Sequence, residues 1–206
     1  MTVVGLTRAT MDQAPEVCRT CVWWQSRGNR VADKGAWIDH VEEAFGEWGT
    51  VYVDRGTPLG SMQYGPASHF PRARDLPAGP ASPDAVLITC AYLTGGAAEW
   101  TEKSLLLAAI GEARDRGMKA IEAFAYRYRP GESVSERFLV HRTVFPRDFL
   151  EEFGFVTVRS AGNVELCRLE LGGLQPAEDG RAQRVLRAVQ GAFVPPPPVP
   201  VLLPPQ

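Results

Sequence analysis

The chain has 206 residues, of which 45% are hydrophobic and 22% are charged. These proportions are those of an ordinary folded protein with one domain, with or without short additions. The formal net charge of −2 at pH 7 argues against a general binder of nucleic acids or membrane surfaces, although a local basic patch is compatible with it.

No stretch approaches the ~20 apolar residues that a membrane-spanning helix needs. The N-terminal sequence MTVVGLTRATMDQ lacks the basic and then apolar layout of a signal peptide. We therefore expect a cytoplasmic protein whose four cysteines, Cys18, Cys21, Cys90 and Cys167, are reduced.

The pair Cys18 and Cys21 forms a lone CxxC motif in CRTCVWWQ. A structural zinc site needs four ligands, and the three histidines are scattered without ligand spacing, so no metal is predicted. The two thiols are interpreted as small core or groove-lining residues beside Trp23 and Trp24.

The N-terminal half predicts two helices and three strands. Val3 to Leu6 is a short β-like run, and Met11 to Cys18 is a first helical stretch. Apolar residues recur at three- and four-residue steps from Asp33 to Trp48, which predicts a helix that Gly49 ends. Thr50 to Asp54 and Pro58 to Gly65 are expected to pair as a β-hairpin.

The middle of the chain predicts a β-α-β unit. Pro66 to Pro83 contains five prolines, which argue for a loop without regular structure. The continuous apolar run from Ala85 to Leu93 is typical of a strand buried on both faces. A helix over Glu99 to Arg116 and a strand over Ala120 to Tyr126 follow, so the two strands are expected to be parallel or nearly adjacent.

The C-terminal third is less regular. Residues 127–144 are interpreted as an irregular and basic stretch, and Pro146 to Phe153 as a short helix with proline in its first turn. Residues 155–160 and 164–171 are expected to form a hairpin. An amphipathic helix is expected over Glu178 to Phe193.

This pattern divides the chain into a domain over residues 1–174, a C-terminal helix within 175–194 and a proline-rich flexible tail over 195–206. The tail, PPPPVPVLLPPQ, cannot pack as a helix or sheet, and similar segments also serve as polyproline ligands of partner domains.

The order of elements, with CRTCVWWQ, ASPDAVLITCAYL and EEFGFVTVR among the local stretches, resembles the GCN5-related N-acetyltransferase (GNAT) superfamily, and in particular an actinobacterial group within it. The resemblance covers roughly Cys18 to Leu171. It implies an α/β fold with a central, mixed, mostly antiparallel sheet of about seven strands and helices on both faces. It also implies a V-shaped split at the strand Leu87 to Leu93, which in this family binds the pantetheine arm of acetyl-CoA.

The loop that should wrap the pyrophosphate departs from the family pattern. In LTGGAAEWTEK, Ala97 falls on the expected Arg or Gln, and Trp100 and Glu102 fall on the two expected small residues. Glu99 and Glu102 place negative charge at a helix N-terminus that should hold an anion, so the loop is expected to cap its own helix. The position of the family's tyrosine acid is occupied by Leu150.

The resemblance and the residue types together give the candidate site. Glu122 and His141 are candidate general bases, and Cys90 is a candidate for lining the thioester or accepting an acyl group. The predicted cofactor-binding residues are Thr89, Cys90, Ala91, Leu93, Gly95, Gly96, Ala97, Ala98, Trp100 and Thr101. The predicted substrate-binding residues are Trp23, Trp24, Tyr64, Tyr126, Arg137 and Arg142.

The predicted function is acyl transfer from a thioester or ester donor to an amine by direct attack. The donor is acyl-CoA, an acyl carrier protein or an aminoacyl-tRNA, since the basic stretch at 127–147 would suit a macromolecular donor in specialised metabolism. A homodimer is compatible with the sequence, and no membrane partner is expected. The alternative is a non-catalytic GNAT-like module that binds a ligand or partner but has lost acetyl-CoA binding.

Overall fold

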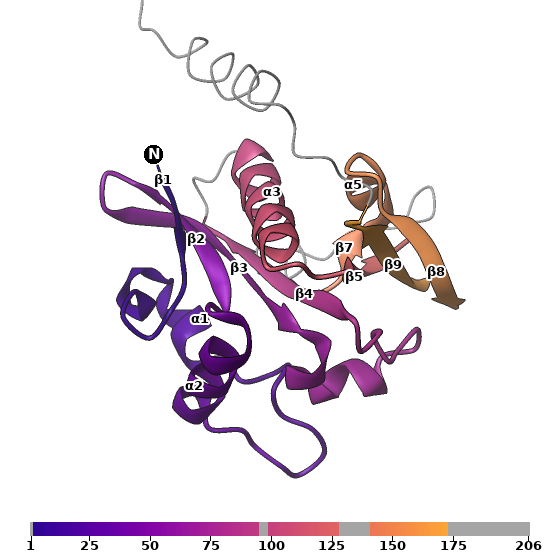
Figure 1. Cartoon of the computed structure of the whole chain (residues 1–206), viewed down its shortest axis with the longest axis horizontal. Coiled ribbons are helices and arrows are strands. Elements are labelled where there is room, and N and C mark those ends of the chain that lie inside the picture. The colour runs from indigo at the N-terminus through magenta and orange to yellow at the C-terminus, as the bar shows by residue number, and fades with distance from the viewer. Residues whose placement is uncertain (1, 95–98, 128–140, 173–206) are drawn as a thin grey trace, which may run out of the picture. The chain divides into compact units, whose positions relative to one another are not determined.

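The computed structural model describes residues 2–94, 99–127 and 141–172, all within one compact unit (Figure 1). The expected helix over 178–193 and the proline-rich tail lie outside the described residues. Among the helices of the described ranges, none is both long enough and apolar enough to cross a membrane.

A single twisted sheet organises this unit. Seven strands run in the order β1-β2-β3-β4-β5-β9-β8, and two short strands, β6 and β7, pair with β4 and β5. Among the described strand pairs, only β4–β5 and β5–β7 are parallel. The strands are β1 (Thr2–Gly5), β2 (Gly49–Asp54), β3 (Thr57–Pro66), β4 (Ala85–Leu93), β5 (Ala120–Tyr126), β6 (His141–Arg142), β7 (Phe145–Pro146), β8 (Val156–Ala161) and β9 (Val164–Glu170). The mixed, mostly antiparallel sheet predicted from the sequence is confirmed.

Helices cover both faces of the sheet, as predicted. An added Cβ at Gly60 of β3 would meet Leu105 of α3 (Glu99–Asp115), whereas the next residue, Ser61, bonds Cys18 of α1 (Glu16–Thr20). Because successive strand residues point to opposite faces, α3 and α1 lie on opposite sides of β3. Helix α2 (Lys34–Phe45) shares the α1 side, where Val41 approaches Gly65.

Three predicted boundaries are corrected where proline or strand pairing decides the local structure. The helix expected from Met11 to Cys18 is divided into a 3-10 turn, η1 (Met11–Gln13), and α1, since Pro15 favours an extended residue before it. The loop expected from Pro66 to Pro83 contains two 3-10 turns, η2 (Ala67–His69) and η3 (Pro71–Asp75), the second with proline in its first turn. The short helix expected from Pro146 is α5 (Arg147–Glu151), because Pro146 pairs in β7.

Helix α2 begins at an N-cap that the sequence supplies. The Asp33 carboxylate accepts a hydrogen bond from the Ala36 amide at 2.7 Å, and this satisfies one of the free amides of the first turn. The cap therefore fixes the start of the helix that carries Lys34 and Trp37 toward the sheet.

We predict that Asp33→Ala lowers the free energy of unfolding by about 1 kcal/mol, because the amide loses its acceptor. Urea denaturation measures the loss. Asp33→Ser is the matched control, since serine also caps helices. An equal loss in both variants would contradict a capping role for the carboxylate.

Candidate functional site

The sheet splits between β4 and β5. The two strands pair only from Ala85 to Ile88 on β4 and from Ala120 to Ala123 on β5. On the other side, β3 stays paired with β4 through a bulge at Thr89, whose hydroxyl donates to the Gln63 carbonyl at 3.1 Å. The second half of β4, from Thr89 to Leu93, therefore leaves β5, and the split predicted at Leu87 to Leu93 is confirmed.

The chain itself pairs with both edges of this split. Strand β6 is antiparallel to β4, with Arg142 opposite Ala91 and His141 opposite Tyr92. Strand β7 runs parallel to β5, and Phe145 lies opposite Ala125. Residues 127–144 were expected to be irregular, and β6 corrects this, because a free strand edge is a ready partner for any nearby backbone. The segment His141–Pro146, which we call the β6–β7 segment, thus lies along the candidate cofactor edge.

Cys90 lies at the split with a buried side chain. Burial raises the pKa of its thiol to about 12, an effect to which the nearby thiols Cys18 and Cys21 add. Cys90 is therefore a neutral thiol near pH 7, suited to lining the split and poorly suited to attack as a thiolate.

Glu122 is fully buried near the closed end of the split, opposite Leu87 in β4. Its two carboxylate oxygens accept hydrogen bonds from the Ser82 amide at 2.7 Å and from Arg168 at 3.0 Å. Arg168 also pairs with Asp84 and Glu170. These contacts favour a structural ion pair over the general base predicted from the sequence.

The remaining predicted cofactor residues are only partly within the described chain. Trp100 packs edge-on against Tyr52 of β2, with ring centroids 4.9 Å apart. The Thr101 side chain is buried, and its hydroxyl has no hydrogen-bond partner among the described residues. Gly95, Gly96, Ala97 and Ala98 lie outside the described residues, as does Arg137, and His141 and Arg142 are described only as backbone.

Two predicted substrate-binding aromatics belong to the core instead. Trp24 is 2% exposed and stacks on Phe124 of β5 with ring centroids 6.0 Å apart. Tyr64 is fully buried, and its hydroxyl bonds the Glu47 carboxylate. Both rings are therefore out of reach of a substrate at the surface. Of the predicted aromatic residues, Trp23, which is 39% exposed beneath Arg72, and the half-buried Tyr126 remain candidates for substrate binding.

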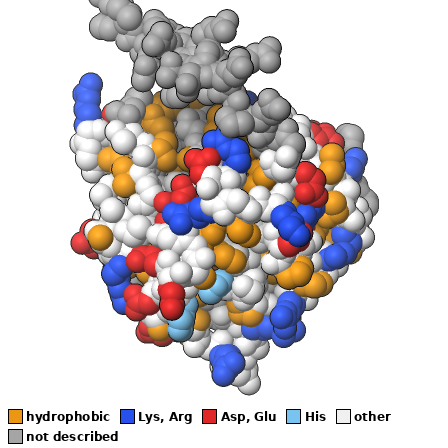
Figure 2. All heavy atoms as spheres, viewed as in Figure 1, with side chains coloured by type: hydrophobic (Ala, Val, Ile, Leu, Met, Phe, Trp, Pro, Cys, Tyr) orange, Lys and Arg blue, Asp and Glu red, His pale blue; other side chains and the backbone are white. Residues whose placement is uncertain are grey.

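Two cations of the basic stretch are neutralised within the fold. Arg147 is buried and pairs with Glu165 at 3.0 Å and with Glu151 at 2.7 Å. Arg127 pairs with the other oxygen of Glu165 at 2.9 Å. On the face shown in Figure 2, acidic and basic side chains are intermixed, without a broad area of one sign.

A cluster of thiols and one amine lies on the α1 side of β3 and β4, and sequence reasoning did not assemble it. Ser61 donates to the Cys18 sulfur at 3.2 Å, and Lys34 contacts the Gln63 side-chain oxygen at 3.4 Å. The Lys34 amine also lies over the rings of Trp37 and Trp48, at 4.4 and 4.8 Å from their centroids. The available signal was Lys34 itself, a lysine one helical turn before Trp37 on the buried stripe of its helix.

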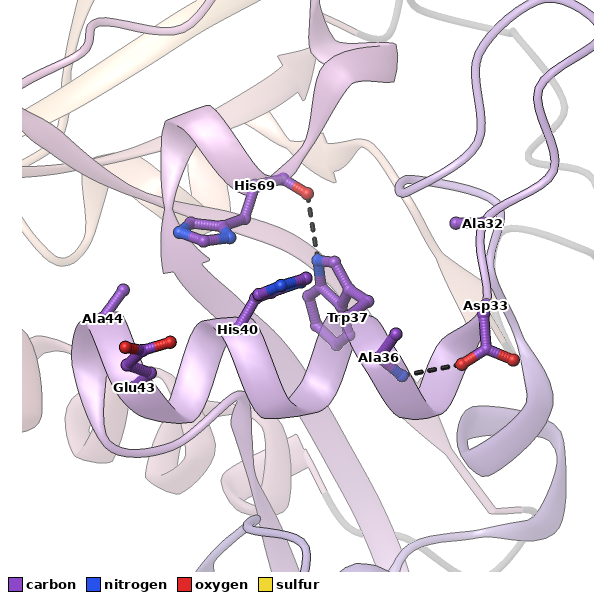
Figure 3. Close-up of a pocket in the computed structure, with 8 residues that line it drawn as sticks. All are labelled: Ala32, Asp33, Ala36, Trp37, His40, Glu43, Ala44 and His69. Atoms are coloured by element: carbon purple, nitrogen blue, oxygen red, sulfur yellow. Dashed lines mark hydrogen bonds between the residues drawn. The ribbon is translucent and has the colours of Figure 1, made fainter.

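A hollow of about 580 Å³ lies elsewhere, between α2 and η2 (Figure 3). His40 and Glu43 of α2 and His69 of η2 line it, and the Trp37 indole donates to the His69 carbonyl at 3.0 Å. Its lining includes no residue of β4 or β5, so the hollow is separate from the split. Within the described ranges, no group of three or more histidine, cysteine or carboxylate side chains is arranged to hold a metal ion.

Comparison with known proteins identifies the fold. No protein-family model matches the chain, and no curated protein matches it by sequence. An aminoglycoside 6′-N-acetyltransferase solved with coenzyme A superposes with a TM-score of 0.52 at 12% identity, over 85% of this chain and all of that one. The fold is that of GNAT N-acetyltransferases.

Two further solved structures, both of acetyltransferases, superpose with lower TM-scores. The inferred acetyltransferase yncA from Salmonella typhimurium, solved with its cofactor acetyl-CoA, has 16% identity and a TM-score of 0.49, over 85% of this chain and 96% of its own. An N-acetyltransferase from Staphylococcus aureus Mu50 has 12% identity and a TM-score of 0.49, over 82% of this chain and 98% of its own.

Proposed function

We propose that the chain is an N-acyltransferase that moves an acyl group from acyl-CoA to an amine. One observation supports this most directly: in a chain with the GNAT fold, β4 leaves β5 after Ile88 and turns the edge from Thr89 to Leu93 toward the split. That edge offers backbone amides and carbonyls to the amide groups of a thioester-bearing arm. The proposal holds whether the amine attacks the donor directly or attacks an acyl group held by the enzyme.

The β6–β7 segment must be reconciled with this proposal. It pairs with Ala91 and Tyr92, which lie within the edge that the donor arm would use. A strand of two residues makes few hydrogen bonds, so its displacement is energetically accessible. We therefore propose that donor binding and β6 pairing compete for the same edge of β4.

The alternative, a non-catalytic module, is supported by the same pairing. If β6 stays on β4 permanently, the edge is closed to the donor and the fold serves binding of another kind. The predicted loss of the pyrophosphate loop points in the same direction.

Isothermal titration with acetyl-CoA separates the two functions. We expect saturable binding with one site per chain, followed by acetylation in a panel of amines that includes an aminoglycoside, because a protein of this fold is an aminoglycoside acetyltransferase. Absence of both binding and acetylated product would overturn the enzyme proposal and leave the binding module.

Whether CoA or a macromolecule carries the acyl group is a separate question. An acyl carrier protein or aminoacyl-tRNA would need a basic rim, for which Arg137 and Arg142 are the candidates, because Arg127 and Arg147 are already paired with Glu165. We propose to compare the same acyl group on free CoA, on a carrier protein and on tRNA at low and high salt. If free CoA serves as well as either macromolecule, and Arg137→Glu with Arg142→Glu behaves like the parent, the macromolecular donor is excluded.

A further inference from the structure

The thiol and amine cluster lies next to the split strand. Ser61, which bonds Cys18, is the pairing partner of Tyr92, and Gln63, which contacts Lys34, is the pairing partner of Cys90. Residues Thr89 to Leu93 form the edge assigned above to the acyl donor. Ser61 lies on β3, the strand next to β4. The half-buried Cys18, which bonds Ser61, is therefore one strand away from the edge where the donor thioester is expected.

Lys34 is placed to carry a proton. Burial lowers the pKa of its amine to about 8, and the thiols of Cys90, Cys21 and Cys18 partly oppose this effect. Among the described residues, the amine contacts the amide oxygen of Gln63 and lies over the two indole rings, and none of these groups is a carboxylate. An amine in such surroundings both takes up and releases a proton near neutral pH.

The pKa of the Cys18 thiol is raised, chiefly by burial; the hydrogen bond from Ser61 and the charge of Lys34 partly oppose this rise, and the nearby Cys21 thiol adds to it. Cys18 is therefore a neutral thiol near pH 7 and needs a base such as Lys34 to become a nucleophile. Cys21 lies three residues further along the same segment, and within the described chain its sulfur accepts no hydrogen bond. Of the two half-buried thiols, Cys18 is therefore the one with a donor on its sulfur.

Gln63 leaves one donor unused beside this pair. Its side chain is 7% exposed, its oxygen contacts Lys34, and its amide nitrogen has no hydrogen-bond partner among the described residues. A buried donor without a partner is costly, and a carbonyl oxygen brought by a ligand would satisfy it. This orphan donor is the independent sign that the cluster receives a ligand.

We propose that Cys18 carries the acyl group as a thioester between the donor and the amine, with Lys34 as the proton carrier and the Gln63 amide as the oxyanion donor. The inference rests on the proposed acyltransferase function and specifies its route.

In the first step the Cys18 sulfur attacks the carbonyl carbon of the donor thioester, and neutral Lys34 takes the thiol proton. The carbon–sulfur bond of the donor then breaks, and Lys34 returns the proton to the leaving thiolate, which yields acyl-Cys18 and a free thiol. In the second step the acceptor amine attacks acyl-Cys18, its proton passes through Lys34 to the Cys18 sulfur, and the products are an amide and the restored thiol. No oxidant or further reactant is needed.

This route also accounts for Leu150. The sequence places this leucine where related proteins carry a tyrosine acid, and its side chain is fully buried. Direct transfer would have no acid at that position, whereas in the covalent route Lys34 protonates the leaving thiolate. The missing tyrosine and the low-pKa lysine are thus complementary features of one mechanism.

The test is to mix the protein with acetyl-CoA in the absence of an amine, quench in acid and measure the intact mass. We expect one acetyl group per chain on the Cys18 peptide, release of one equivalent of CoA, and removal of the group by neutral hydroxylamine, which cleaves thioesters and spares amides. Cys18→Ala should lack the adduct. Cys21→Ala, the matched control on the same segment, should keep it. Lys34→Met should slow its formation by about 100-fold or more, the size typical of a lost acid–base group.

Three results would overturn the inference while leaving the proposed function intact: acetyl-CoA binds and no adduct forms, the adduct resists hydroxylamine, or Cys18→Ala acetylates amines at the parent rate. Peptide mapping of the parent protein decides the site of acetylation even where a variant fails to fold. Failure of the parent to bind acetyl-CoA by titration would instead overturn the proposed function, and the thioester route with it.

Discussion

A disulfide that joins β6 to β4 is expected to abolish donor binding. Arg142 lies directly opposite Ala91 in the antiparallel pair. Directly opposed residues in such pairs have Cα atoms about 4.5–5.5 Å apart, within the range that a disulfide spans. In the variant Ala91→Cys with Arg142→Cys, oxidation should therefore hold the β6–β7 segment on the edge of β4.

The size of the effect follows from the competition between β6 and the donor. A ligand that binds only the open form has an apparent affinity reduced by the fraction of molecules that are open. If the cross-link makes that fraction roughly 100-fold smaller than in the reduced protein, acetyl-CoA should bind about 100-fold more weakly. Reduction of the disulfide should restore the parent affinity, as measured by isothermal titration on one sample before and after reduction.

The controls isolate the position of the cross-link. Each single cysteine variant, oxidised alone, tests for unwanted pairing with the native Cys90. A cross-link between Thr2→Cys and Val53→Cys joins opposed residues at the far edge of the same sheet, between β1 and β2, and should leave affinity unchanged. Equal acetyl-CoA binding by the oxidised and reduced forms of the β6–β4 variant would show that the donor does not use this edge.

The parts of the fold that depend on local sequence were predictable. The apolar run Ala85 to Leu93 is β4, and the helical period from Glu99 onward is α3, which ends one residue before the predicted Arg116. Both signals are properties of single segments. The β-α-β rule then gives the parallel pairing of β4 with β5, which the structure confirms.

The parts that depend on distant residues were not predictable. Glu122 looked exceptional as a carboxylate within an apolar strand, and its partner Arg168 lies 46 residues away in the sequence. Cys18 meets Ser61, and Lys34 meets Gln63, only because α1 and α2 cover the same face of β3. Contacts between residues far apart in the sequence leave no periodic pattern. The chemical type of Glu122 therefore suggested a general base, whereas its contact with Arg168 favours a structural role.

The pair Glu122 and Arg168 should be far more important for stability than for catalysis. Glu122 is fully buried, and the Arg168 side chain is 13% exposed. Removal of one member of a buried ion pair leaves an unpaired charge and typically costs about 3–5 kcal/mol. We therefore predict that Arg168→Met lowers the free energy of unfolding by about 4 kcal/mol in urea denaturation.

Two further variants turn this prediction into a test of the general-base hypothesis. Arg114→Met, which removes an exposed pair with Asp115, should cost less than about 1 kcal/mol. Glu122→Met combined with Arg168→Met should recover most of the stability, because an apolar pair of similar volume replaces the buried charges. If Glu122 only holds the sheet together, this double variant should acetylate amines at a rate close to that of the parent. A stable double variant that binds acetyl-CoA and has lost turnover would instead assign Glu122 to the chemistry. The structural role would be contradicted if Arg168→Met lowered the free energy of unfolding no more than Arg114→Met does.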